Sequence, residues 1–162
     1  MHVIITCKMK KHLFINLKAQ TMKKLFALTV VFMSIGLASN AQCDGTTKWT
    51  CNKQTFIDAS GNTVMEKDEM ATVTSSDKAV TIKPEGNDDF MEGNVSDYKC
   101  NWSEPGKNGK PVFKSEVTDN SGKIRHATIT IEAKDGKITI LLEAEEESNK
   151  ILLTVEKYEA VK

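Results

Sequence analysis

Apolar and polar residues alternate along the C-terminal half of the chain. In residues 123–133, one parity holds small or aliphatic side chains: Ala127, Ile129, Ile131 and Ala133. Residues 137–144 and 150–159 repeat this alternation, with aliphatic residues at every second position. Successive side chains of a β-strand point to opposite faces of a sheet, so a period of two predicts strands with one buried and one solvated face.

Eight segments with β-character are separated by clusters of turn-forming residues. The segments are approximately 47–57, 63–74, 78–83, 90–102, 110–118, 123–133, 137–144 and 150–159. Gly, Asn and Asp in the clusters accept the left-handed backbone angles of hairpin turns, and Asp135-Gly136 is the strongest hairpin signal. Residues 64–71 are rich in helix-forming residues, so one or two helical turns are the alternative there. The short connections predict an all-β, antiparallel meander.

Eight antiparallel strands need a way to protect the edges of their sheet. Closure into an up-and-down barrel removes the edges, whereas a sandwich, the alternative, leaves some exposed. The even spacing favours an eight-stranded barrel. The eight strands, the early tryptophan in Lys48-Trp49-Thr50 and a cysteine pair resemble the lipocalin-like (calycin) group of small secreted barrels. This resemblance covers the architecture of residues 46–159, and Thr47 stands where lipocalins have the glycine of Gly-x-Trp.

An export signal precedes the β-rich region. Met22-Lys23-Lys24 provides a charged start, residues 25–37 are apolar, and Ser39-Asn40-Ala41 fits the small-x-small cleavage pattern. The apolar run is shorter than the ~20 residues that span a bilayer as a helix. We therefore predict a signal-peptide helix with cleavage after Ala41, rather than a buried or anchoring helix.

This signal divides the chain into three parts. Residues 1–21 precede a complete signal and are predicted to be a spurious extension, residues 22–41 are the signal peptide, and residues 42–162 form a single β-barrel domain. The mature domain is expected to be periplasmic or secreted, with no membrane span after cleavage.

The charge of the exported domain argues against some classes of binding partner. Six of the 22 basic side chains are lysines in residues 1–41, where no acidic residue occurs, so residues 42–162 carry 16 basic and 22 acidic side chains. An acidic domain without a basic run argues against nucleic acid and anionic membrane surfaces as partners.

Three cysteines lie in the exported domain, where a disulfide can form: Cys43, Cys51 and Cys100. Trp49-x-Cys51 and Cys100-x-Trp102 mirror each other, and each cysteine is expected to share a strand face with its tryptophan. We predict a Cys51–Cys100 disulfide closing a loop of about 50 residues, which the chain-entropy model values at roughly 4 kcal/mol. Cys43–Cys100 is the alternative.

The exported domain offers little for catalysis. Its single histidine, His126, falls on the Thr/Glu face of its segment and is interpreted as a solvated residue of the barrel wall. No nucleophile elbow, phosphate loop, dinucleotide fingerprint or zinc-ligand spacing occurs. The acidic turns at 85–89 and 119–122 lack the spacing of a calcium loop. We therefore expect no enzymatic activity, no metal and no cofactor.

Aromatic residues provide the remaining functional clue. Small eight-stranded barrels either fill their interior with side chains or hold one small ligand. We take five rings as candidate ligand contacts, with a packed core as the alternative: Trp49, Phe90, Tyr98, Trp102 and Phe113. The predicted function is non-catalytic binding of a small apolar or amphipathic ligand at the barrel mouth. The alternative is a cell-envelope structural or protein-interaction module with a filled core, no ligand and an unknown protein partner.

Overall fold

The computed structural model describes residue 43, residues 45–86 and residues 88–161. These residues form eleven strands: β1 (Thr46–Ile57), β2 (Thr63–Lys67), β3 (Ala71–Ser75), β4 (Ala79–Pro84), β5 (Met91–Lys99), β6 (Trp102–Glu104), β7 (Asn108–Gly109), β8 (Val112–Asp119), β9 (Ile124–Lys134), β10 (Lys137–Ala144) and β11 (Lys150–Val161). The predicted signal peptide at 22–41 and the segment 1–21 lie outside the described residues.

Among the described residues, no helix is long and apolar enough to cross a bilayer.

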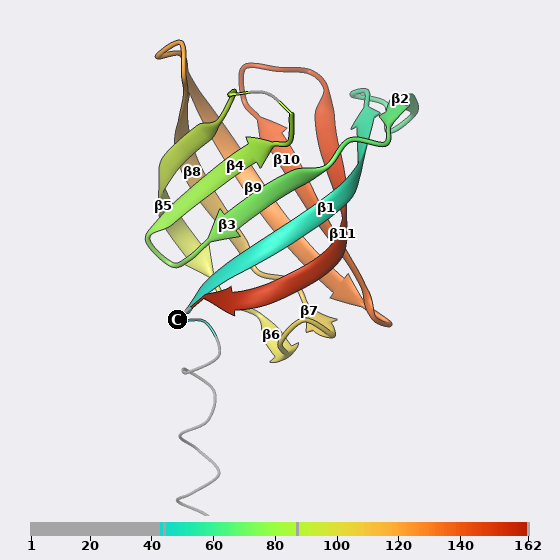
Figure 1. The fold of residues 1–162 in the computed structure, drawn as a ribbon, viewed down its shortest axis with the longest axis vertical. Helices are drawn as coiled ribbons and strands as arrows, with labels where there is room; N and C mark the ends of the chain where they lie inside the picture. Colours follow the sequence, from blue (N-terminus) through green and yellow to red (C-terminus); the bar gives the residue numbers. More distant parts are fainter. Residues whose placement is uncertain (1–42, 44, 87, 162) are drawn as a thin grey trace, which may run out of the picture. The chain divides into compact units, whose positions relative to one another are not determined.

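Eight of these strands close into an antiparallel barrel (Figure 1). Their order is β10-β11-β1-β3-β4-β5-β8-β9, and the pairing of β9 with β10 completes the circle. Among these eight strands, each strand pairs with the next one along the chain. The exception is the pair of β1 with β11, which joins the first strand to the last. The predicted all-β class and eight-stranded antiparallel barrel are confirmed, and the architecture is consistent with a calycin-like barrel.

The segment predicted at 63–74 contains two strands rather than one. β2 pairs with the second half of β1, and β3 pairs with the first half. The helical alternative at 64–71 is wrong, because β1 is long enough to pair with both strands and its hydrogen bonds hold residues 63–67 extended.

Residues 102–109 contain two further short strands that the sequence pattern did not indicate. β6 and β7 form a small hairpin with Trp102 opposite Gly109, and Gly109 also pairs with Ala133 of β9. Gly106 makes the turn with φ of 71°, a conformation that favours glycine. The hairpin lies at the same end of the barrel as the C-terminal end of β11 (Figure 1).

The core is built mainly from side chains at alternate positions of β1, β3, β4, β8, β9, β10 and β11. The inward row predicted on β9 is confirmed, since Ala127, Ile129, Ile131 and Ala133 are all buried. Phe113, on the neighbouring strand β8, is also fully buried. Alternation along the strands therefore does set which face is buried, as a half-solvated antiparallel sheet requires.

Aromatic rings close the end of the barrel that carries the β6–β7 hairpin. Trp49 is buried, and its ring stacks on Trp102 at 6.3 Å and on Tyr158 at 5.6 Å between centroids. Its indole Nε1 donates a hydrogen bond to Ser75 Oγ at 2.9 Å. A Cβ on Gly106 would overlap the Tyr158 ring, so the hairpin lies directly against this stack. We call Trp49, Trp102 and Tyr158 the aromatic stack.

The predicted Cys51–Cys100 disulfide is wrong, and the alternative pair forms instead. Cys43 and Cys100 are bonded, with 6.1 Å between their Cα atoms, while Cys51 is unpaired and fully buried. The positions of the tryptophans did not predict the pairing, because residues 90–102 do not form one regular strand. The register of β5 shifts between Ser96 and Lys99, and the strand ends there, so Cys100 is an exposed residue outside the strand. Such a disulfide is compatible with an extracellular or periplasmic location.

Candidate functional site

A cavity of about 390 Å³ opens at the barrel end opposite the aromatic stack. Its wall is mainly apolar and is provided by six of the barrel strands. The main wall residues are Ile82 on β4, Met91 on β5, Val117 on β8, Ala127 on β9, Leu142 on β10 and Ile151 on β11. The barrel thus has one end filled by aromatic rings and one end with a lined cavity.

Arg125 is the most distinctive residue of this cavity, because it is the single arginine in the 162-residue sequence. It lies opposite Val117 in the pairing of β8 with β9, and it shares the inward parity of Ala127. Its side chain is only 20% exposed. A charged group so close to the core requires charged or polar partners, because leaving water without them is costly.

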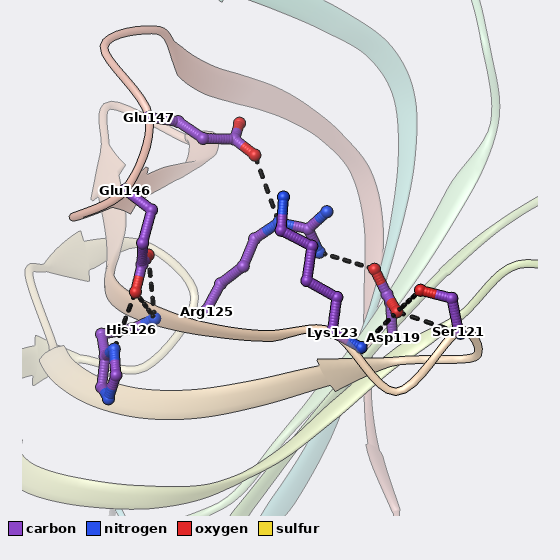
Figure 2. Close-up of polar contacts among 7 residues, drawn as sticks. All are labelled: Asp119, Ser121, Lys123, Arg125, His126, Glu146 and Glu147. Atoms are coloured by element: carbon purple, nitrogen blue, oxygen red, sulfur yellow. Dashed lines mark hydrogen bonds and ion pairs between the residues drawn. The ribbon is translucent and has the colours of Figure 1, made fainter.

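Two carboxylates from different connections supply those partners (Figure 2). Arg125 Nη1 donates to Asp119 Oδ2 at 2.9 Å, and Nε donates to Glu147 Oε1 at 3.2 Å. Asp119 ends β8, whereas Glu147 belongs to the turn between β10 and β11. The guanidinium therefore links the β8–β9 hairpin to the β10–β11 turn across the mouth of the cavity.

Asp119 is a firmly ionised member of this group. The Ser121 hydroxyl donates to Asp119 Oδ1 at 2.6 Å, and the backbone N–H groups of Ser121 and Lys123 donate to the same atom at 3.0 Å. The Ser121 hydroxyl first, then the Lys123 N–H and the Arg125 guanidinium, lower the pKa of Asp119 from 3.8 to about 2. The side chain organises its own turn while holding Arg125.

His126 is exposed on the outer face of β9, and its ring points away from Arg125 (Figure 2). Its ring Nδ1 lies 2.7 Å from Glu146 Oε1, and its backbone N–H donates to the same carboxylate at 3.0 Å. The hydrogen bond with Glu146 is the main cause that raises the pKa of His126. Its side chain is 57% exposed, so the predicted outward, solvated position is confirmed.

Three consecutive residues of the turn after β10 contact β9, and together they reach both faces of that strand. The Glu145 N–H donates to the His126 carbonyl at 2.8 Å, Glu146 holds the outer face at His126, and Glu147 holds the inner face at Arg125. This attachment places Glu147 and Asn149 in the cavity lining.

The structure does not bring the five predicted aromatic contacts together. Trp49 and Phe113 are buried in the core, and Tyr98 packs on Phe113 at 5.6 Å between ring centroids. Trp102 is half-buried in the aromatic stack. Phe90 lies at the other end, where it lines the cavity and is 37% exposed. Whether any of these rings contacts a ligand stays a prediction.

Sequence reasoning missed Arg125, although one signal for it exists. Arg125 precedes Ala127 by two positions, so it continues the apolar row of residues 127–133 with a charged side chain. Charged side chains are almost never buried without a partner. An arginine at a position that faces inward beside core residues therefore indicates a structural or binding role. The carboxylate partners carry no such signal, because Asp119 is the last residue of its strand and Glu147 belongs to a turn.

The chemistry of the cavity is that of an apolar wall with an ionic rim. Cys51 is not among its lining residues, and burial raises the pKa of that thiol to about 11. No group of three or more His, Cys, Asp or Glu side chains within the described ranges could hold a metal ion. The arrangement can accommodate an apolar body and contact a polar head group at the mouth.

Comparison with known proteins does not place this barrel in a family, since no family model, curated protein or solved structure matches the chain.

Proposed function

We propose that this protein is an exported, non-catalytic barrel that binds one small amphipathic ligand in the cavity at its open end. The observation that carries the proposal is the asymmetry of the two barrel ends. One end is filled by the aromatic stack, and the other holds a cavity of about 390 Å³ with an apolar wall and an ionic rim. Ligand sites are typically apolar clefts of about 300–1,000 Å³ with a few polar groups that orient the ligand.

Export and a lipocalin-like relationship are parts of the same proposal. The signal predicted at residues 22–41 and the Cys43–Cys100 disulfide both support an oxidising location outside the cytoplasm. The closed barrel of eight antiparallel strands supports a relationship with the lipocalin-like group at the level of architecture.

A protein-interaction module remains the second candidate because of β2. Among the described residues this strand pairs only with β1, so its other edge is open. It also carries Val64 and Met65, which are 61% and 43% exposed. An open strand edge with exposed apolar side chains is a common place for another chain to add a strand.

Two variants on one strand test the binding proposal. Leu142 lines the cavity, whereas its neighbour Leu141 points to the opposite face of β10. Leu142→Trp fills the cavity, and Leu141→Trp adds the same side chain outside it. The uncharged fluorophore N-phenyl-1-naphthylamine reports binding, and thermal unfolding shows that both variants are folded.

We expect saturable binding by the unmodified protein and by Leu141→Trp, with an affinity about tenfold or more weaker for Leu142→Trp because the apolar contact area is lost. Equal binding by both variants would overturn the placement of the site in this cavity. The absence of saturable binding to the unmodified protein would overturn the proposal itself and favour the interaction module.

A further inference from the structure

The rim of the cavity carries more negative than positive charge. Its ionisable residues are three carboxylates and one guanidinium: Asp89, Asp119, Glu147 and Arg125. The formal charge of this set is therefore negative, although the wall below it is apolar. Asn120 and Asn149 complete the polar lining, and Asn120 Nδ2 donates to Asp89 Oδ1 at 3.0 Å.

Arg125 offsets this charge only in part, because its guanidinium already contacts two of the rim carboxylates. The guanidinium binds Asp119 through Nη1 and Glu147 through Nε. An anionic head group at the remaining N–H groups of Arg125 would lie beside the carboxylates of both Asp119 and Glu147. Asp119 cannot neutralise itself near pH 7, since its hydrogen bonds hold its pKa at about 2. Like charges at such short range disfavour the anion.

Glu147 is better suited than Asp119 to receive a cation. Its side chain is 46% exposed, whereas that of Asp119 is 17% exposed. The contact of Glu147 with Arg125 uses Oε1, while Asp119 uses both oxygens in hydrogen bonds to Arg125, Ser121 and the Lys123 N–H. The half-exposed ring of Phe90 lines the same cavity, and an aromatic face attracts ammonium groups.

We infer that the ligand of this cavity is an amphipathic cation, with an ammonium head group at the rim beside Glu147 and a hydrocarbon body against the apolar wall. This inference rests on the proposed binding function and specifies its ligand class. The carboxylates supply the charge that recognises the head group, and Arg125 holds two of them in position.

Three ligands with the same ten-carbon chain test the head-group preference: decylammonium, decanol and decanoate. Isothermal titration calorimetry of the exported domain at pH 7, below the micelle concentration of each compound, gives the three affinities. We expect decylammonium to bind about tenfold or more tightly than decanoate, with decanol between them, because the rim attracts one charge and repels the other.

A matched pair of variants locates the effect. Glu147→Gln removes a carboxylate from the rim, whereas Glu145→Gln removes the same charge from a residue of the same turn that does not line the cavity. Glu147→Gln should weaken decylammonium binding several-fold and leave decanol binding unchanged, while Glu145→Gln should leave both unchanged. A thermal melt of each variant shows that the turn is intact.

The outcomes separate this inference from the proposed function. Decanoate binding as tightly as decylammonium, or equal effects of Glu147→Gln and Glu145→Gln, would overturn the head-group inference while decanol binding still supports the cavity. If none of the three compounds binds, the proposed function fails and the inference fails with it.

Discussion

Removing the Cys43–Cys100 disulfide should lower the free energy of unfolding by about 4 kcal/mol. The two residues are 57 positions apart in the sequence. The chain-entropy model assigns a loop of this length about 4 kcal/mol, because the cross-link restricts the unfolded chain much more than the folded one. For a domain of this size, such a loss corresponds to a decrease in Tm of about 15 °C.

The assay is chemical denaturation of four proteins, each with and without dithiothreitol: the unmodified domain, Cys43→Ser, Cys100→Ser and Cys51→Ala. Tryptophan fluorescence follows unfolding, since Trp49 and Trp102 lie in the aromatic stack. The unmodified domain and Cys51→Ala should lose about 4 kcal/mol on reduction. Cys43→Ser and Cys100→Ser should already be less stable and should not respond to the reductant.

Two results would refute this reasoning. If Cys51→Ala abolished the effect of dithiothreitol and Cys43→Ser retained it, the disulfide would be Cys51–Cys100. If the pairing were Cys43–Cys100 but reduction cost less than about 1 kcal/mol, loop entropy would not be the source of stabilisation, and residual structure in the unfolded chain would be implicated. Alkylation adds a third check, because the buried Cys51 thiol should react with iodoacetamide only after unfolding.

Three further predictions concern the core, the hairpin turn and the rim. Phe113→Ala should cost about 4 kcal/mol in a urea titration, because the ring is fully buried and its removal leaves a cavity. Gly106→Ala should lower the Tm and the near-ultraviolet circular dichroism of the aromatic stack, because the new Cβ would overlap the Tyr158 ring at a φ of 71°; Gly122→Ala, also at positive φ but in open space, should leave the near-ultraviolet signal unchanged. The lowered pKa of Asp119 means that its contribution to stability is present above its ordinary value of 3.8 and is lost as the pH falls towards about 2. Asp119→Asn should therefore be less stable than the unmodified protein at pH 6 in urea titrations and should approach it at the lowest pH, and a constant difference would contradict the linkage.

The site itself was only partly predictable from the sequence. The aromatic residues of the sequence include Phe90, which lines the cavity, but they also include Trp102, which lies in the aromatic stack at the other end. The parity of residues along a strand tells which face they share but not how deep in the barrel they lie. Depth depends on the stagger between neighbouring strands, which local periodicity does not encode.

The sequence by itself determined most of the barrel strands, the inward face of β9 and the turn between β9 and β10. The alternation of residues 127–133 predicted the buried row of β9, because the period of two is a local property of an extended backbone. Asp135-Gly136 likewise predicted the turn between β9 and β10, where both residues have positive φ. These features depend on neighbours within a few positions, so a single sequence contains them.

Only the tertiary structure decided the cysteine pairing, the difference between the two barrel ends and the partners of Arg125. Cys43 and Cys100 are 57 positions apart and Arg125 and Glu147 are 22 apart, so these pairs meet only when the strands pair into the barrel, whereas Asp119 reaches Arg125 within the β8–β9 hairpin. Barrel closure is a global condition on register and strand number. The residues that supply the rim of the proposed binding site come from strand ends and turns of separate hairpins, and the arrangement of those hairpins around the barrel brings them together.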